Sequence, residues 1–472
     1  MDLRAAPLRW TFRPPSLAAG RGGDRYLVVL GAVLLGYAVM GRGFAYLGVP
    51  PLYVGEATLA LGLTALLAMR GASWAGLPGP MGWLAVLVLA VAVRAAAGVP
   101  EWGLDAVRDA MLVGYAGFAF VAGGLVLERP ERLRDLVVRY RWLVWAVVLA
   151  AWPLHFLDRF APMTYPTWPW APTVEVVETK PGDLLVHLAA ITAALLVGLA
   201  RARTALLVAL VVGVAALVVT SRAGMLAFVV GMGAYALWRP AGARAGRLLY
   251  VGAVVVALGV AFGSSGVAVN GTRTLSAEQV VENVKSIAGQ SDDPALRGTA
   301  DWRLRWWSEI VGYTVGGEHF LLGKGFGVNL ATADGFQVYE DESLRSPHNS
   351  HFTVLARGGV PLFLLWLVVQ GLWLRTVARA RRRARRQGQD GWAAFFTVCA
   401  VFGLAAVVNA SFDVYLEGPM GGVWFWTVFG LALAGARLQE THPALLDGLV
   451  ESRAPTPRPP SAPWSWSRPP AR

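Results

Sequence analysis

Long uninterrupted apolar blocks dominate the chain and limit the folds that are open to it. Of its 472 residues, 56% are hydrophobic and 15% are charged, and the apolar residues do not follow the short alternations of a soluble core. Each block is about as long as a bilayer-spanning helix, which needs roughly 20 residues. The sequence therefore predicts an all-α polytopic membrane protein with about 12 transmembrane helices. They are expected at residues 26–41, 52–69, 81–98, 108–127, 142–157, 184–200, 204–220, 223–238, 248–263, 351–374, 392–412 and 420–437.

The distribution of basic residues predicts the orientation of these spans. With a cytoplasmic N-terminus, the inner segments hold 28 of the 42 Lys and Arg residues, the short outer connections hold 6, and the long outer segment and its border hold 8. Short loops with more Lys and Arg face the cytoplasm. The net charge of +12 therefore reflects membrane topology, with contact to anionic lipids, and does not indicate nucleic-acid binding.

Two tails and one long loop complete the predicted organisation. Residues 1–25 carry five arginines and no cleavable apolar core, so we expect a cytoplasmic tail and not a signal peptide. Transmembrane helices at 26–263 and 351–437 flank an extracytoplasmic loop at 264–350. Residues 438–472, which are rich in proline towards the end, are expected to form a disordered cytoplasmic tail. The lone Cys399 lies in a span and permits no internal disulfide.

The two longer outer segments differ in their expected structure. Residues 158–183 are rich in proline and tryptophan and are expected to be irregular. The segment 264–350 has room for helices, one beginning with a capping box at Ser276 and Gln279 and one beginning near Thr299. The glycines of residues 323–328 indicate a tight turn that approaches another group closely. The other loops are short, so no soluble catalytic domain is expected, and the inner side carries no nucleotide motif. An enzyme that acts in the membrane or on its outer face must therefore draw on bond energy in its substrate or on a gradient.

Histidine and asparagine mark the point where the long loop returns to the membrane. His348 and Asn349 stand directly before an apolar helix that begins near His351. Asn349 or Ser350 is well suited to cap this helix, which leaves His348 unexplained. A neutral imidazole accepts a proton near neutral pH, so His348 is the candidate general base, whereas His351 fits an interfacial position as well.

Arginines form a second group of candidates. Arg222 lies in a TSRAG turn between two spans, on the face where basic residues are scarce. It could extend to lipid headgroups, or its guanidinium could clamp a phosphate oxygen. In DWRLRWWSEIV, Arg303 and Trp307 share one helix face and Arg305 points elsewhere. That helix could instead lie on the membrane with its tryptophans as anchors. Lys324 and Arg345 add cations nearby in sequence.

The order of these motifs resembles a known family. A TSRAG turn, an R-x-x-x-W pair in a long outer loop, an L-x-G-x-G turn through Gly323 and Gly325, and HN before a helix with Gly358 and Gly359 are typical of the bacterial O-antigen ligase and O-antigen polymerase superfamily. PPLYVGE at residues 50–56 is similar to a stretch near the second span of such proteins.

The resemblance implies a lipid-linked glycan transferase of the GT-C type in the bacterial inner membrane. Such enzymes transfer a glycan from undecaprenyl diphosphate to a glycan, lipid or protein hydroxyl on the outer face. Arg222 and Arg303, with Arg305, would hold the diphosphate and His348 would act at the reaction centre. Asn349, Trp307, Lys324 and Arg345 are the further candidates for substrate binding. No cofactor or metal is implied, and the paired acids Asp292–Asp293 and Asp341–Glu342 fit solvated loop charges better than a metal site.

Several polar residues within or beside spans have no assigned role. Glu56 is expected to pair with an arginine such as Arg42, and His187, Asn409, Asp413 and Glu417 remain open. A transporter or lipid flippase is the main rival function, although we find no internal repeat of the kind such proteins show. A non-catalytic assembly factor is a third. The sequence does not distinguish a ligase from a polymerase, with polymer formation slightly favoured, and it leaves the sugar, the acceptor and the oligomeric state open.

Overall fold

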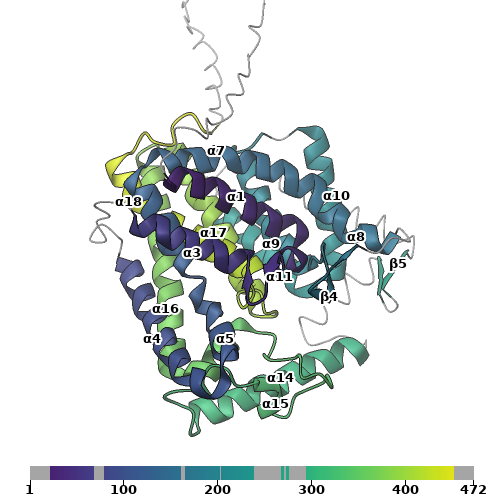
Figure 1. Cartoon of the computed structure of the whole chain (residues 1–472). Helices are drawn as coiled ribbons and strands as arrows, with labels where there is room; N and C mark the ends of the chain where they lie inside the picture. The colour runs from purple at the N-terminus through teal and green to yellow at the C-terminus, as the bar shows by residue number, and fades with distance from the viewer. Residues whose placement is uncertain are drawn as a thin grey trace, which may run out of the picture.

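The computed structural model describes residues 22–68, 79–160, 165–201, 203–238, 267–270, 273–275 and 294–450. These residues form helices and three small two-stranded sheets (Figure 1). The helices of the first half are α1 (Gly22–Met40), α2 (Arg42–Ala45), α3 (Val54–Leu67), α4 (Gly79–Trp102), α5 (Leu104–Gly114), α6 (Gly117–Glu128), α7 (Glu131–Ala146), the π-helical turn η2 (Val147–Ala151) and α8 (Trp152–Phe160). Those of the second half are α9 (Pro181–Val197), α10 (Thr204–Thr220), α11 (Arg222–Trp238), α14 (Pro294–Val315), α15 (Leu330–Ala333), α16 (Ser350–Arg386), α17 (Asp390–Ala410) and α18 (Pro419–Thr441).

The predicted class of a multi-pass helical membrane protein is confirmed. In the described part of the chain, six helices are long and apolar enough to cross a membrane, and α5 with α6, bent by 42°, adds a seventh when counted as one span. Four shorter apolar helices, α3, α9, α10 and α11, coincide with further predicted spans. The span expected at 248–263 lies outside the described residues, so the count of twelve stays a prediction.

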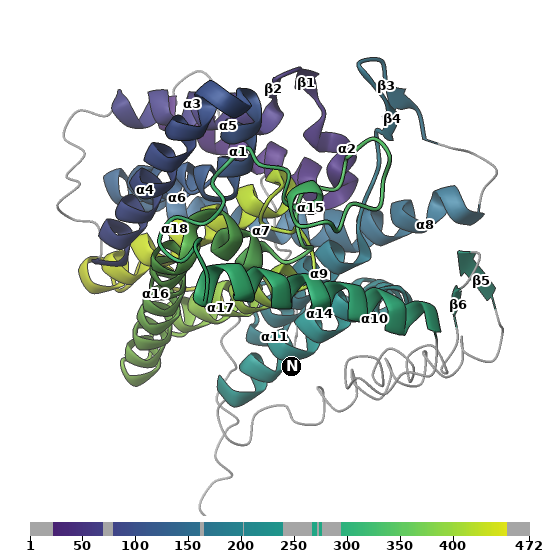
Figure 2. The same ribbon diagram turned by 90° about the horizontal axis from the view of Figure 1, so that it is seen from below.

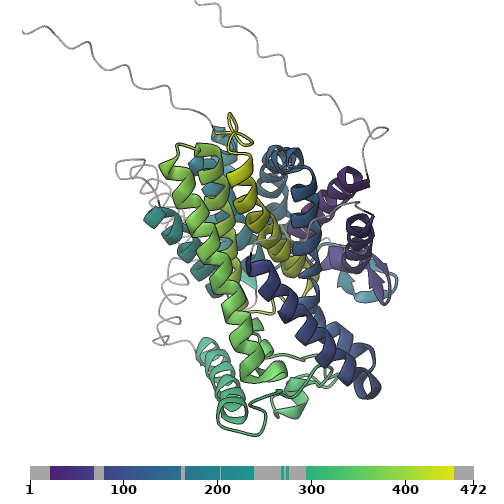
Figure 3. The ribbon, with the colours of Figure 1, turned by 90° about the vertical axis from the view of Figure 1, so that its left-hand side faces the viewer.

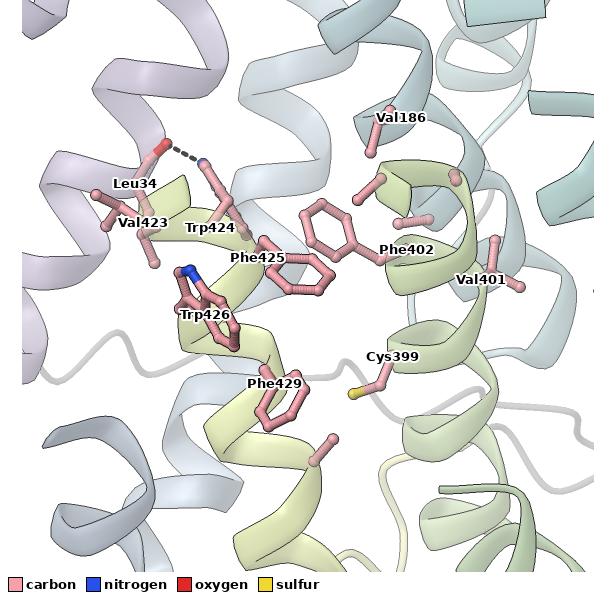
Figure 4. Close-up of a cluster of buried hydrophobic side chains, with 14 of the residues drawn as sticks. Leu34, Val186, Cys399, Val401, Phe402, Val423, Trp424, Phe425, Trp426 and Phe429 are labelled. Atoms are coloured by element: carbon pink, nitrogen blue, oxygen red, sulfur yellow. Dashed lines mark hydrogen bonds between the residues drawn. The ribbon is translucent and has the colours of Figure 1, made fainter. Parts of the chain in front are cut away.

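The centre of the bundle is packed by aromatic side chains of α16, α17 and α18. Trp366, Trp392 and Trp426 are fully buried, and Figure 4 shows Phe402 of α17 facing Trp424 and Phe425 of α18. A buried indole needs an acceptor for its N–H group. That of Trp424 donates to the Leu34 carbonyl of α1 at 2.8 Å, so this ring is also fixed in orientation.

The bundle has two distinct ends. Helices α14 and α15 lie across one end, and α7 lies at the other (Figures 1 and 2). Helix α16 runs between them along the length of the molecule (Figure 3). Residues 442–450 are at the α7 end, where the guanidinium of Arg134 donates to the Leu445 carbonyl at 2.7 Å and that of Arg141 donates to the Leu449 carbonyl. Order therefore continues beyond residue 438, the predicted start of the C-terminal tail, because α18 extends to Thr441 and these arginines hold the segment that follows. The two predicted tails otherwise fall on residues 1–21 and 451–472, outside the described part.

The tryptophan-rich part of the segment at 158–183 forms a hairpin, which corrects the expectation of an irregular stretch there. β3 (Thr167–Trp168) pairs antiparallel with β4 (Ala171–Glu175), with Pro169 in the turn, where its missing N–H group costs nothing. The indoles of Trp168 and Trp170 stack with centroids 5.2 Å apart and donate to the Gly43 and Tyr46 carbonyls at 2.7 and 2.9 Å. The hairpin is thereby attached to α2. The other sheets pair β1 (Gly48–Val49) with β2 (Leu52–Tyr53) and β5 (Val267–Asn270) with β6 (Arg273–Leu275).

Candidate functional site

The glycine turn packs onto a break in α16. At Gly359 the backbone leaves the helical region (φ 72°, ψ −176°), and Pro361 follows. The break leaves two carbonyls of α16 without a helical N–H donor. The glycine turn supplies both donors: Lys324 N donates to Ala356 O at 2.7 Å, and Gly325 N donates to Arg357 O at 3.0 Å. A Cβ at Gly323 would lie 2.4 Å from the Arg357 carbonyl carbon. The expected close approach is therefore confirmed, and it joins the long loop to the helix that follows His348.

Asn349, one of the two residues predicted to cap this helix, is the N-cap of α16. Its side-chain oxygen accepts from the backbone N–H groups of His351 and Phe352 at 3.0 and 3.1 Å, and the residue is buried. His348, immediately before it, has a positive φ of 52°. This backbone conformation is uncommon for residues other than glycine and is found at functional sites. The tight cap thus fixes the position from which the imidazole projects.

His348 faces a carboxylate from the connection between α17 and α18. Its Nδ1 lies 3.9 Å from Asp413 Oδ1. The ammonium of Lys180, the residue before α9, donates to both oxygens of Asp413 at 2.9 and 3.1 Å. A carboxylate at Nδ1 orients an imidazole and favours the tautomer with its proton on that nitrogen. The other ring nitrogen, Nε2, is then the one able to accept a proton.

The electrostatics of this group favour an ionised carboxylate. Burial would raise the pKa of Asp413, but the nearby imidazole of His348 and the charge and hydrogen bonds of Lys180 outweigh burial and hold the pKa below its ordinary value. Burial would likewise lower the pKa of Lys180, and the charges of Asp413 and Asp183 raise it instead. The site therefore contains a fixed ion pair beside the imidazole.

Arg303 reaches the same connection from α14. Its Nη1 donates to the Phe412 carbonyl at 3.0 Å, one residue before Asp413. Its Nε is buried and has no hydrogen-bond partner among the described residues, so one donor of the guanidinium is still available. Burial lowers the pKa of Arg303, and the charge of Asp413 opposes that shift. The structure thus brings Arg303 and His348 to one short segment.

Trp307 holds the backbone before His348. Its indole Nε1 donates to the Pro347 carbonyl at 2.9 Å, and its ring stacks on Phe352 at 5.2 Å. Trp302, on the same helix, lies with its ring centroid 6.4 Å from that of His348. These contacts favour a supporting role for Trp307 and place Trp302 beside the imidazole.

Arg222 opens α11 at the same end of α9 as Lys180. A Cβ at Gly224 would lie 2.7 Å from the Cα of Gly182, so the first turns of α9 and α11 are in close contact. Ser221 caps α11 by accepting from Gly224 N at 3.0 Å. The Gly182–Gly224 contact is two residues from Lys180 on one helix and two residues from Arg222 on the other, so the backbones of Lys180 and Arg222 lie at the same end of the bundle.

The remaining predicted cations have other partners. Arg305 is exposed and its Nε donates to its own helix at the Asp301 carbonyl, 3.4 Å away. Lys324 pairs with Asp334, whose side chain is fully buried, and the Lys324 ammonium lies 4.3 Å from the Tyr313 ring centroid. These contacts favour a structural role for Lys324.

Arg345 belongs to a buried ion-pair cluster around Asp109 of α5. Asp109 Oδ2 lies 3.1 Å from Arg345 Nη2 and 2.9 Å from Arg357 Nη1, and it accepts from Gly327 N at 3.1 Å. Arg345 also meets Asp105 at 3.2 Å. The cluster ties α5, the glycine turn and α16 together, and no periodic pattern in the sequence predicts it.

Other candidates from the sequence have partners elsewhere in the bundle. Both ring nitrogens of His351 are bonded, Nε2 to the Val407 carbonyl at 3.1 Å and Nδ1 to the Trp366 indole at 3.0 Å. Glu56 accepts from Tyr115 at 2.8 Å, and Arg42 pairs with Glu178 at 2.8 Å. The expected Glu56–Arg42 pair is therefore wrong, because the hairpin segment brings a nearer acid to Arg42.

Acidic groups of the kind that hold a metal are not clustered in the described residues. Asp341 accepts from Ser343 N at 3.1 Å and, with Glu342, is exposed. Asp292, Asp293 and the capping box at Ser276 lie outside the described part. The sequence alone assigns no role to Asp413 or Lys180. Asp413 stands out only as a polar residue at the end of an apolar span, and Lys180 lies in a loop.

Together the fold and the site define a multi-pass helical membrane protein with a polar, histidine-containing site at the end of its bundle covered by α14. Residues 207–367 match the model of the O-antigen ligase family, which confirms the resemblance to the O-antigen ligase and polymerase superfamily. At family level the match supports a membrane glycan ligase or polymerase. The matched segment contains Arg222, Arg303 and His348, whereas Lys180 and Asp413 lie outside it. A comparison with curated proteins finds no match.

Proposed function

We propose that this protein transfers a glycan from undecaprenyl diphosphate to an acceptor hydroxyl on the outer face of the bacterial inner membrane. The observation that carries the proposal is the meeting of His348, Asp413 and Arg303 within one short segment. An oriented base beside a fixed guanidinium suits a reaction in which a hydroxyl attacks and a polyanion leaves.

The proposed step balances without ATP. The acceptor oxygen forms a bond to the anomeric carbon as the bond from that carbon to the diphosphate oxygen breaks, which inverts the configuration. The acceptor proton passes to Nε2 of His348, whose Nδ1 is oriented by Asp413. The bonding electron pair leaves with the diphosphate, and the guanidinium groups of Arg303 and Arg222 stabilise the charge that develops on it.

The remaining residues support this site in the proposal. Trp307 and Asn349 fix the backbone on either side of His348, the first through Pro347 and the second through the helix cap. Arg345 acts through Asp109 and Lys324 through Asp334. Arg305 is an exposed cation that attracts the diphosphate towards the site. The outer location follows from the excess of basic residues in the opposite loops.

The test is transfer by the full chain in proteoliposomes that contain a defined undecaprenyl diphosphate glycan and candidate hydroxyl acceptors. We expect a glycan–acceptor product from the wild type, and a higher donor KM with Arg222→Ala and Arg303→Ala. Movement of the donor across the bilayer without product would instead support the flippase alternative. Asp390→Asn, an exposed change at the α7 end, is the control that should leave both readouts unchanged.

A further inference from the structure

An apolar pocket of about 580 Å³ lies between α1, α7, α9, α17 and α18. Its size is in the range of sites that hold small molecules. Cys399 and Phe402 of α17 and Trp424 of α18 line it. Figure 4 shows Cys399 and Phe402 pointing from α17 towards α18, and Trp424 pointing from α18 towards Leu34 of α1. Val28 and Trp142 also line it and are 37% and 68% exposed, so the pocket opens outward between α1 and α7.

The pocket belongs to the end of the bundle opposite to His348. Its lining includes seven residues of α7 from Leu133 to Leu143, and it also includes Leu199, whose carbonyl accepts from Arg141 at 2.8 Å. Its inner limit is His187 in the middle of α9, packed edge-on against Trp424 at 4.9 Å. A donor whose diphosphate is held near His348 would therefore have its headgroup at the wrong end for this opening.

The charge at the opening selects the kind of lipid. Of the lining residues in the described part of the chain, only Arg139 carries a permanent charge, and it is exposed. Glu131 and Asp135 are the exposed acids of α7. Asp24 at the start of α1 and Glu128 at the end of α6 are bonded to Arg132 at 2.6 and 2.5 Å. Anionic lipids are attracted to basic residues at the cytoplasmic surface.

We propose that this pocket holds one acyl chain of an anionic phospholipid, with the lipid phosphate paired to Arg139. The apolar wall receives the hydrocarbon chain, and the guanidinium at the opening receives the headgroup. The proposal concerns a site separate from the proposed transfer reaction and does not depend on it.

Native mass spectrometry of the full chain, offered phosphatidylglycerol and phosphatidylcholine in equal amounts, tests the headgroup. We expect phosphatidylglycerol to be retained preferentially, and Arg139→Ala to reduce the preference about fivefold, as about 1 kcal/mol per basic residue implies. Equal retention of the two lipids by the wild type, or an unchanged preference in the variant, would overturn the proposal.

A variant whose added side chain fills the pocket tests whether an acyl chain binds there. Gly31 lines the pocket and a Cβ there would meet no atom within 4 Å, so Gly31→Leu should occupy the space without a clash. Gly82 is equally open but is not a lining residue, which makes Gly82→Leu the matched control. We expect Gly31→Leu to lower bound phosphatidylglycerol at least about fivefold and Gly82→Leu to leave it unchanged.

The thiol of Cys399, the one cysteine of the chain, gives an independent readout inside the same pocket. Added phosphatidylglycerol should slow its alkylation by N-ethylmaleimide in the wild type and not in Gly31→Leu. Wild-type lipid binding by Gly31→Leu, equal losses in both leucine variants, or protection by undecaprenyl phosphate alone would each contradict the proposal.

Discussion

The imidazole Nδ1 of His348 lies 3.9 Å from Asp413 Oδ1, although the two residues are 65 positions apart in the chain. The same carboxylate binds the ammonium of Lys180 at 2.9 Å. Three segments, the residue before α9, the end of the long loop and the α17–α18 connection, therefore meet at one group of charges. In the proposed reaction, this contact orients the imidazole of His348 as the base.

Removal of the charge on Asp413 should slow transfer. Asp413→Asn keeps the side-chain shape but no longer favours the tautomer with its proton on Nδ1, so we expect the turnover number to fall about 100-fold or more. Donor KM should change by less than about threefold, because the change is not at the diphosphate. Steady-state kinetics with a labelled donor measures both, and an unchanged turnover number would remove Asp413 from the site.

The lowered pKa of Asp413 also predicts how the thermal stability of the protein varies with pH. Burial would raise its pKa, but His348 and Lys180 outweigh burial and lower it below the ordinary value of 3.8. A carboxylate of this kind contributes stability above its unfolded pKa and loses it as pH falls through the folded pKa. The difference in melting temperature between wild type and Asp413→Asn should thus be constant near neutral pH and shrink below pH 3.8. Tryptophan fluorescence during thermal unfolding measures it, and a difference that widens in acid would contradict the ion pair.

Lys324→Met should destabilise the long loop. The variant leaves the carboxylate of Asp334, which is fully buried, with the Trp306 and Tyr313 hydrogen bonds but no cation. An uncompensated buried charge costs about 3–5 kcal/mol. Hydrogen exchange across α14 and α15 should show the loss. Arg305→Met, an exposed change on α14, should stay within about 0.5 kcal/mol of wild type. Normal exchange with a raised donor KM in Lys324→Met would mean that Lys324 binds substrate instead.

Gly323→Ala should cost more than Gly335→Ala. Both glycines have positive φ, 60° and 75°, but a Cβ at Gly323 would lie 2.4 Å from the Arg357 carbonyl carbon, and at Gly335 it would meet nothing within 4 Å. The left-handed conformation alone costs about 1–2 kcal/mol, so Gly335→Ala should lose about that much. Gly323→Ala must in addition displace the turn from α16. Equal losses in thermal unfolding would show that the turn does not rest on the helix break.

The membrane helices and the cap of α16 could be read from the sequence, because each depends on local pattern. Apolar length predicts a span, and Asn349 before an apolar run predicts a cap. The hairpin at 167–175 could not, since its prolines and tryptophans become regular only when Trp168 and Trp170 bond to the carbonyls of Gly43 and Tyr46.

The partners of charged residues depended on tertiary contacts of the same kind. Arg42 and Glu56 are close in sequence, yet Glu178 and Tyr115 are their partners in space. His348 and Arg303 could be singled out by residue type and position. Asp413 and Lys180 could not be assigned, because nothing in their own segments indicates that they meet.

The most direct test of the account is His348→Gln in the defined transfer assay, with donor binding measured in parallel. Glutamine keeps a polar side chain of similar reach but cannot accept the proton, so we expect the turnover number to fall about 100-fold or more while donor affinity stays within about twofold. Transfer at close to the wild-type rate by this variant would contradict the assignment of His348 as the base.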